Sequence, residues 1–524
     1  MSKPAAILFS LLAVSSALAS DIRVPEDHEN IQAAIDNATP GDLVSVAPGR
    51  YRERIRLQPG VTVRSRDDAD EAGKIGVRRA EMTILDGGGE QGDNPGVLMA
   101  AGSTLDGFTI TGVGVYDEET WQKHFETRGE NLPDEEGSVQ EGSTVAAVSI
   151  PAIDCTVTNN IVHHNGDVGI SVVGSPDQQS IPLICDNVVY RNLGGGIGAA
   201  DHAAPIIRSN TCYENLPAGI GCRNSNPLII ENICHGNIRA GIGCREGARP
   251  VIRGNECYRN RRAGIGIRMD ETAPVVEDNE CYENGMAGIG CRDGARPVIR
   301  NNHCHHNQMA GIGCDGGRPT IIGNHCRENE MAGIGLRGAA TAVIHGNRCI
   351  ENQLVAIGVT AGSTADIADN KLLRTGGRPP LIAIKDGSTA TVSKNHIEGG
   401  GVAAILVQGA ATIRQNTLAS EQERQGKAVW VWEGSQANIS SNDFHGYDSA
   451  VTAAKSKITI TDNTIADFGR TAIIVADSSH PAHIYSNTAT SEDRDAQVVK
   501  INGPAGVIAE NVLTVQGAPR VEVP

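Results

Sequence analysis

The sequence predicts an all-β solenoid, a parallel β-helix of about 16 or more coils with a short N-terminal capping helix. An Asn recurs every 21 to 27 residues over most of the chain. Each repeat holds short β-branched runs between Gly, Asn and Asp turn signals, and no repeat has a stretch with the length and period of a helix. Phe, Tyr and Trp make up only 3% of the 524 residues, whereas Gly supplies 62 of them.

The recurring Asn is followed two residues later by an apolar residue or Cys. In a parallel β-helix each coil stacks on the last at about 4.8 Å, so equivalent residues form columns. Asn suits the turn because its amide can bond the coils above and below, and because it tolerates left-handed backbone angles. The sixteen positions are Asn160, Asn187, Asn210, Asn232, Asn255, Asn279, Asn302, Asn324, Asn347, Asn370, Asn395, Asn416, Asn442, Asn463, Asn487 and Asn511.

The N-terminus reads as an export signal. Residues 1–19 contain Lys3, an apolar run too short to span a bilayer and Ala17-Leu18-Ala19 as a small-x-small cleavage site. No later segment reaches 18 apolar residues, so we expect no membrane span. We therefore expect a secreted or periplasmic protein. Residues 29–38 predict an amphipathic helix that covers the first coil with Ile31 and Ile35.

The period divides the rest of the chain. We expect the cap and first irregular coils over 20–145, regular coils over 146–515 and a loose tail over 516–524. At about 113–143 the repeat breaks at an acidic insert, for which we expect no regular secondary structure. Such an insert either borders a binding face or forms a mobile surface loop. Its large rings are Tyr116, Trp121, His124 and Phe125.

The 13 cysteines follow the repeat. The position two after the Asn holds Cys in seven coils and an aliphatic residue or Phe in others, so Cys replaces inward-facing apolar residues. Free Cys behaves as a small buried hydrophobe, which favours core packing over metal binding. Parallel Cβ vectors make disulfide geometry poor between stacked coils. The two columns are Cys212, Cys234, Cys257, Cys281, Cys304, Cys326 and Cys349, and Cys222, Cys244, Cys291 and Cys314.

Several N-terminal segments resemble a known superfamily. They include Val24-Pro25-Glu26-Asp27, Ile31-Gln32-Ala33-Ala34-Ile35 and Leu105-Asp106-Gly107-Phe108. The organisation resembles the right-handed parallel β-helix proteins of the pectin-lyase-like superfamily, which include uronate lyases, C5-epimerases and NosD-type periplasmic proteins linked to copper-site maturation. The resemblance implies a right-handed coil. It transfers no catalytic residues, because the Asp-pair and Gly-His-Gly pattern of polygalacturonases and the Asp-Pro-His-Asp motif of alginate epimerases are absent from the sequence.

An outward column carries most of the basic groups that could bind a ligand. Guanidinium forks bind carboxylates bidentately, so the column predicts a groove for an anionic polymer. The alternative is a surface ladder neutralised by Glu246, Asp293 and Asp315. In uronate lyases a Lys or Arg removes the proton beside a neutralised carboxylate. We therefore take as candidate catalytic residues Arg268, Arg292, Asp315 and Arg337, and as candidate substrate-binding residues Arg223, Arg245, Tyr258, Tyr282 and Trp432.

A further set is typical of metal ligands. Successive coils place Glu280, His303 and His325 one residue before the Cys, and these side chains could converge on one ion. The alternative is a solvated polar column. The sequence requires no cofactor, and the candidate ion is divalent: calcium, copper or zinc.

The net charge of −17 argues against nucleic acid as a partner. The leading hypothesis is recognition or processing of an acidic polysaccharide, by uronate lyase or C5-epimerase chemistry if the protein is catalytic. The first alternative is a non-catalytic periplasmic accessory protein of the NosD kind, with a metal-related role. The second is a structural or adhesive surface module. Fold analogy supplies most of this ranking.

Overall fold

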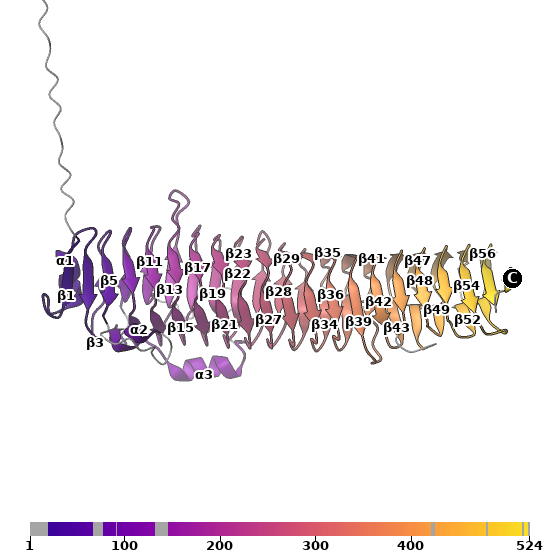
Figure 1. Ribbon diagram of the computed structural model, residues 1–524, viewed down its shortest axis with the longest axis horizontal. Helices are drawn as coiled ribbons and strands as arrows, with labels where there is room; N and C mark the ends of the chain where they lie inside the picture. Colours follow the sequence, from indigo (N-terminus) through magenta and orange to yellow (C-terminus); the bar gives the residue numbers. More distant parts are fainter. Residues whose placement is uncertain are drawn as a thin grey trace, which may run out of the picture.

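The chain coils into one elongated right-handed solenoid (Figure 1). The computed structural model describes residues 19–66, 77–90, 92–130, 145–420, 425–477, 480–515 and 518–521. Most of the predicted signal peptide, the second half of the insert and most of the predicted tail lie outside the described residues. The described part confirms the parallel β-helix and its coil number, because one of its sheets contains 20 strands.

Three parallel sheets run the length of the solenoid, and each regular coil contributes one strand to each. In one coil these are β26 (Val275–Glu277), β27 (Glu280–Tyr282) and β28 (Ile289–Arg292). We call the sheet of β26 sheet A, that of β27 sheet B and that of β28 sheet C. Sheet A runs from β1 (Asp21–Val24) to β56 (Ala505–Ala509).

Sheets B and C carry the candidate sites. The other strands of sheet B that matter here are β12 (Ile161–His163), β15 (Val188–Tyr190), β18 (Thr211–Tyr213), β21 (Ile233–His235), β24 (Glu256–Tyr258), β30 (His303–His305), β33 (His325–Arg327) and β48 (Asp443–His445). Those of sheet C are β16 (Ile197–Ala200), β19 (Ala218–Arg223), β22 (Ala240–Arg245), β25 (Ile265–Arg268), β31 (Ala310–Asp315), β34 (Ala332–Arg337), β37 (Val355–Val359), β40 (Ile382–Ile384), β43 (Ala403–Val407) and β46 (Lys427–Val431).

The predicted Asn ladder lines the turn between sheets A and B. The Asn279 side-chain amide donates to the Asn302 Oδ1 at 2.9 Å and to the Ile252 carbonyl at 2.9 Å, and Asn279 is 1% exposed. The left-handed backbone lies one residue earlier than we expected, at Asp278 with φ 56°. Asn is thus selected for its buried amide, which satisfies turn carbonyls that water cannot reach.

The core contains the predicted cysteine columns. All 13 cysteines are free and buried. The seven cysteines of the first column, which follow the repeated Asn, are 0% exposed. The register pairs Cys281 with Cys304, so equivalent thiols stack between coils. Burial raises the pKa of the Cys155 thiol to about 12, which keeps it protonated at neutral pH. Cys therefore serves here as a core residue, as predicted.

Three helices accompany the described strands. Helix α1 (Ile31–Asn37) starts at the Asn30 cap and buries Ile31 and Ile35, which confirms the predicted N-terminal cover. Helix α2 (Arg78–Met82) lies beside the first coils. No helix among the described residues is long and apolar enough to span a membrane.

The first half of the insert is a helix, α3 (Glu118–Glu126), where we expected no secondary structure. The Asp117 carboxylate caps it by accepting from the Glu119 and Thr120 amides. Trp121 is 2% exposed, and its indole donates to the Glu214 carbonyl at 2.8 Å. The helix therefore packs along the side of the solenoid (Figure 1). Tertiary contacts of the insert's rings, rather than helix propensity, hold it there.

Candidate functional site

The predicted arginine column exists on the outer edge of sheet C. Strand pairing aligns Arg223 with Arg245, Arg268 with Arg292, and Asp315 with both Arg292 and Arg337. Backbone bonds continue the row towards the C-terminus, because the amides of Lys385, Gln408 and Trp432 each bond the preceding coil at equivalent positions. The candidate catalytic and basic substrate-binding residues therefore lie in one row.

Carboxylates interleave with this row. Arg337 pairs with Asp315 at 2.9 Å and Arg292 with Asp293 at 2.9 Å. Glu246 lies 3.3 Å from Arg245 and 3.9 Å from Arg223. The Arg337 side chain is 60% exposed and its Asp315 partner 48%. Pairs in such contact with water contribute little to stability and can be exchanged for the carboxylates of a ligand.

Arg245 is the most enclosed of these four arginines, with a 19% exposed side chain. Burial lowers the pKa of its guanidinium, and the positive charges of Arg268 and Arg223 act in the same direction against Glu246. Because water is partly excluded there, a carboxylate placed beside Arg245 would interact more strongly than one at the exposed end of the row.

A column of glycines lies beside the arginines. Because side chains alternate along a strand, the outward neighbour of Arg223 on β19 is Gly221. The pairing register continues this position through eight consecutive coils of sheet C. We call these residues the glycine floor: Gly198, Gly221, Gly243, Gly266, Gly290, Gly313, Gly335 and Gly358.

The fold does not require glycine at most of the floor, although a Cβ at Gly358 would lie 3.3 Å from the Val355 Cγ2. A Cβ at Gly290 would approach no atom closer than 3.8 Å, and one at Gly221 would meet nothing within 4 Å. The other glycine of the same motif differs, because a Cβ at Gly288 would lie 2.8 Å from the Gly311 carbonyl oxygen. Glycine in a strand costs about 0.5–1 kcal/mol relative to alanine. The floor therefore keeps backbone bare at some cost to stability.

Two tryptophans close the floor at its C-terminal end. Register carries the floor position from Gly358 through Ala383 and Leu406 to Trp430. Trp432, predicted to bind substrate, lies two residues further and is 43% exposed. The two rings meet edge to face at 5.4 Å. The glycine floor with its bordering arginines, called the trough below, thus leads through Ala383 and Leu406 to two aromatic rings.

The predicted substrate-binding tyrosines lie elsewhere, on the outer face of sheet B. Tyr258 and Tyr282 stack with ring centroids 5.0 Å apart and planes 7° from parallel. They belong to a continuous ring stack with steps of 4.7 to 5.1 Å. Its members are His163, Tyr190, Tyr213, His235, Tyr258, Tyr282 and His305. Inside the stack each ring face covers another ring, so these residues present ring edges and hydroxyls outward.

Burial sets the protonation of the stack. It raises the pKa of Tyr213 to about 12 and lowers the pKa of His163 to about 4. The Tyr282 hydroxyl donates to the Glu256 carboxylate at 2.5 Å, and burial together with this bond raises the pKa of Tyr282. The stack is therefore neutral at pH 7.

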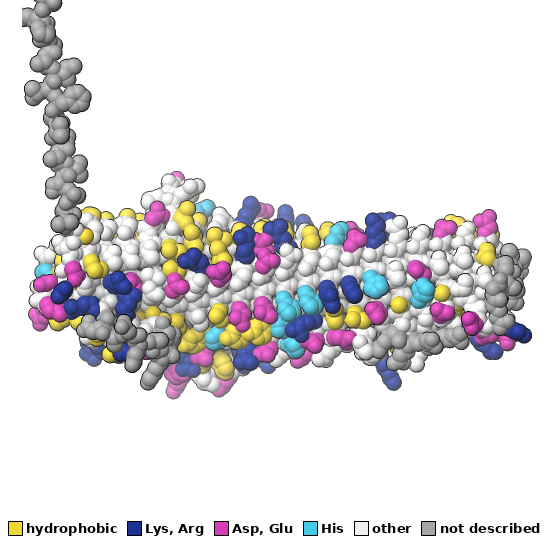
Figure 2. Space-filling view, viewed as in Figure 1, with side chains coloured by type: hydrophobic (Ala, Val, Ile, Leu, Met, Phe, Trp, Pro, Cys, Tyr) yellow, Lys and Arg dark blue, Asp and Glu magenta, His cyan; other side chains and the backbone are white. Residues whose placement is uncertain are grey.

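The predicted metal ligands lie at the end of this stack. Figure 2 shows histidine side chains gathered near the middle of the visible face. Glu280 lies beside His303 as predicted, but the third side chain whose donor atom joins them is His305, not His325. His325 instead stacks on His303, with ring centroids 4.9 Å apart and planes 10° from parallel.

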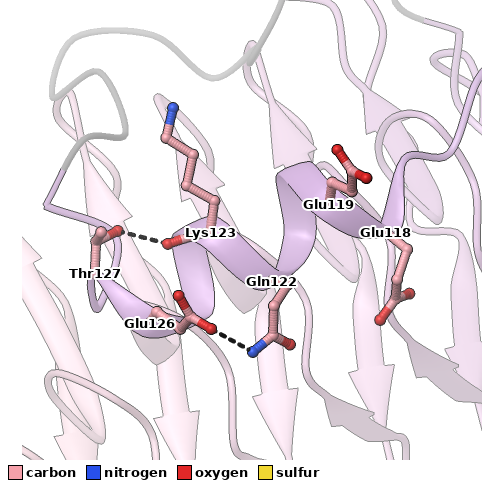
Figure 3. Close-up of a pocket in the computed structure, with 6 residues that line it drawn as sticks. All are labelled: Glu118, Glu119, Gln122, Lys123, Glu126 and Thr127. Carbon is pink, nitrogen blue, oxygen red and sulfur yellow. Dashed lines mark hydrogen bonds between the residues drawn. The ribbon is translucent and has the colours of Figure 1, made fainter.

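A surface hollow on α3 is a poor candidate for an anionic ligand. Its six lining residues all come from this one helix and the residue after it (Figure 3). Three of them are acidic: Glu118, Glu119 and Glu126. The Gln122 amide donates to Glu126 at 2.9 Å, so part of the polar surface is already satisfied.

Sequence reasoning missed three elements of these sites. The glycine floor was visible as the second Gly of each Ala-Gly-Ile-Gly unit, but only the structure separates it from the sterically required first Gly. Trp430 was hidden because its coil departs from the motif. The complete ring stack was signalled by the third residue after the repeated Asn, which is Tyr or His in seven successive coils from His163 to His305.

Comparison with known families agrees with the fold. Residues 177–312 and 287–418 match the family model described as right handed beta helix region. Residues 380–503 match the model described as periplasmic copper-binding protein (NosD). No curated protein matches the chain.

Solved structures give weaker similarities. The mannuronan C-5 epimerase A-module of Azotobacter vinelandii is 14% identical over 85% of this chain and 96% of its own, with a TM-score of 0.36. The Dettilon tailspike protein is 14% identical over 69% and 68%, with a TM-score of 0.43. A PL6-family alginate lyase is 11% identical over 94% and 100%, with a TM-score of 0.29. Similarity at this level carries no information about activity.

Proposed function

Because this chain is a right-handed parallel β-helix protein, we propose that it is exported and binds an acidic polysaccharide along the outer face of sheet C. The observation that carries the proposal is the glycine floor beside the arginine row. A linear polymer aligned with the solenoid axis would meet the same groups once per coil, at about 4.8 Å intervals. Bare backbone lets a flat sugar chain approach closely, and the guanidinium groups pair with its carboxylates.

The two ends of the trough carry different groups, so a bound glycan would have a preferred orientation. The Trp430 and Trp432 rings provide apolar faces on which a sugar ring can pack. Arg245, partly shielded from water, provides the strongest site for a carboxylate. If the protein is an enzyme, we place the catalytic site at the adjacent side chains of Arg292, Asp315 and Arg337. Arg268 lies one coil before Arg292. At that site a cation would neutralise the uronate carboxylate, and the adjacent proton would pass to an arginine that has left its carboxylate partner and given its own proton to solvent.

Binding to alginate, pectate and a glycosaminoglycan tests the proposal. Gly290→Leu would obstruct the floor with a side chain whose Cβ meets no atom closer than 3.8 Å, and Arg292→Ala would remove a guanidinium. Each should weaken binding by at least tenfold in calorimetric titrations. Arg259→Ala is the matched control, because it removes an exposed, ion-paired arginine from the turn that follows β24 of sheet B. Absence of binding to all three glycans, or an equal loss in the control, would refute the proposal.

The same incubations test turnover. A lyase generates unsaturated uronates that absorb in the ultraviolet, and an epimerase exchanges the C5 proton with solvent. If the protein binds a glycan but gives neither signal, it is a lectin-like protein and not an enzyme acting on that glycan.

A second function is a metal-related periplasmic accessory role. The match of residues 380–503 to the periplasmic copper-binding model favours it. Metal analysis of protein isolated from the periplasm is the test, and stoichiometric copper is the supporting result. Protein isolated without bound copper or zinc would argue against this function.

A further inference from the structure

Three ligand-type side chains converge on the outer face of sheet B, away from the proposed glycan trough. Glu280 lies on β27, and His303 and His305 lie on β30 in the next coil. One donor atom from each lies within 4.8 Å of the other two. The Glu280 Oε1 is 3.1 Å from the His305 Nε2 and 3.4 Å from the His303 Nδ1.

These separations fit metal coordination. Two ligand atoms bound tetrahedrally at 2.0–2.1 Å lie about 3.3–3.4 Å apart. The 3.1 and 3.4 Å separations in the protein therefore need only small side-chain rotations. The strands hold the ligands in place, because the register pairs Glu280 with His303 and Tyr282 with His305. Sites on paired strands are better preorganised than sites on loops.

The neighbours of His305 allow the hydrogen bonds expected of a metal-bound imidazole. Its Nδ1 lies 2.8 Å from the His306 Nδ1, and the His306 Nε2 lies 3.2 Å from the Glu328 carboxylate. A proton on the His305 Nδ1 and another on the His306 Nε2 satisfy both contacts. In this tautomer the His305 Nε2 lone pair faces the Glu280 Oε1 at 3.1 Å, an arrangement of two acceptors that a bound cation would stabilise. Metal-binding histidines typically donate their other N–H in this way.

His303 is held in the opposite state. The Arg327 Nε donates to the His303 Nε2 at 3.0 Å. A neutral imidazole has only one acceptor nitrogen, so the proton must then sit on Nδ1, the atom that would bind the metal. Arg327 also pairs with Glu328, towards which it can turn when it releases His303.

We propose that Glu280, His303 and His305 bind one divalent transition-metal ion of the zinc and copper class, and that Arg327 opposes binding by holding His303 in the wrong tautomer. Two imidazoles and one carboxylate suit these ions, and three protein ligands leave a position open for water or substrate. The site lies outside residues 380–503, so it does not follow from the copper-binding match.

Titration of the metal-free full-length protein with Zn²⁺ and Cu²⁺ in a calorimeter tests the proposal. We expect one ion per chain. His305→Ala and Glu280→Gln should each weaken binding at least tenfold. Arg327→Gln should tighten it several-fold, because the glutamine oxygen can accept the His303 Nε2 proton that metal binding requires. The matched control is His445→Ala, which removes another histidine that faces a carboxylate on sheet B.

The controls separate this site from the cysteines and from misfolding. All variants retain the buried thiols, so binding that persists unchanged in His305→Ala would overturn the site. Weaker or unchanged binding in Arg327→Gln would overturn the role of Arg327. Thermal unfolding of metal-free Glu280→Gln should match that of the parent chain, since Glu280 is 49% exposed. His305→Ala removes an 11% exposed ring from the end of the stack and should unfold at a lower temperature, so Glu280→Gln is the variant that separates lost binding from lost stability. Glycan binding involves another face, so failure of either proposal leaves the other intact.

Discussion

The outer faces of sheets B and C use the same repeat in opposite ways. On sheet B seven successive coils, from His163 to His305, place a ring on the ring of the previous coil, and the side chains satisfy one another. On sheet C a neighbouring row is glycine for eight coils, and the arginines beside it rely on exposed carboxylates. The comparison shows that most of the ring stack is complete without a ligand. The outer face of sheet C instead exposes backbone at glycines, most of which have room for a Cβ.

The largest expected effect is a difference in stability between alanine substitutions at two neighbouring glycines of sheet C, Gly264 just before β25 and Gly266 within it. Gly264→Ala should destabilise the protein by about 3 kcal/mol, because overpacking forces backbone shifts. Its Cβ would lie 2.6 Å from the Gly288 carbonyl oxygen. Gly266→Ala should be neutral or stabilising by up to about 1 kcal/mol, since its Cβ meets only the Ala240 Cβ at 3.6 Å. Urea unfolding measures both. Equal losses would show that the floor glycines are structural.

The second effect tests burial in the ring stack of sheet B. Burial, with help from the charges of His164 and Arg50, lowers the pKa of His163 from 6.5 to about 4. Between these values the unfolded chain binds more protons than the folded one, so stability falls as pH falls from 6.5 towards 4. His163→Phe retains a ring but cannot titrate. At pH 5 it should remove a penalty of about 2 kcal/mol.

Urea midpoints at pH 7.5 and pH 5 measure this difference. The other histidines titrate in both proteins, so only the change between parent and variant is informative. The same pH dependence in both proteins would mean that His163 is not buried in the stack.

A smaller effect concerns the polar edge of the stack. Tyr282→Phe deletes the hydroxyl that donates to Glu256, a partly buried bond to a charged group, and should cost about 1 kcal/mol. The Glu256 carboxylate then loses its donor, while the ring contacts with Tyr258 and His305 persist. Unfolding midpoints check the loss. Tyr258→Phe provides the comparison for removal of a hydroxyl from the same stack. An unchanged midpoint in Tyr282→Phe would show that water replaces the bond.

The smallest effect belongs to the arginine row of sheet C. Arg337→Ala breaks an exposed pair with Asp315 and should change stability by no more than about 0.5 kcal/mol. Added salt should remove even this difference, because exposed charges are screened. Urea unfolding of the parent chain and of Arg337→Ala at low and high salt measures this difference in stability. A loss above 1 kcal/mol would mean that the row serves the fold rather than a ligand.

The sequence predicted which residues stack in the same column and whether that column faces the core or the solvent. The period placed Cys304 inside and Arg292 outside, and the structure confirms both because one register runs through all coils. The same reasoning chose the wrong third metal ligand, because it looked only along one column. We predicted His325, which shares the column of Glu280 and His303, but the side chain that joins them is His305 from the neighbouring column. Helix α3 was unpredictable for a related reason, since Trp121 finds its partner Glu214 93 residues away.

A repeat of 21 to 27 residues was enough to establish the coil, its dry interior and the grouping of like side chains into rows, because a solenoid repeats one local geometry. What each row can do depended on distances between coils. Whether a glycine is sterically obligatory, whether a ring offers its face or its edge, and which nitrogen of His303 is available are set by atoms from adjacent turns, which no single repeat contains.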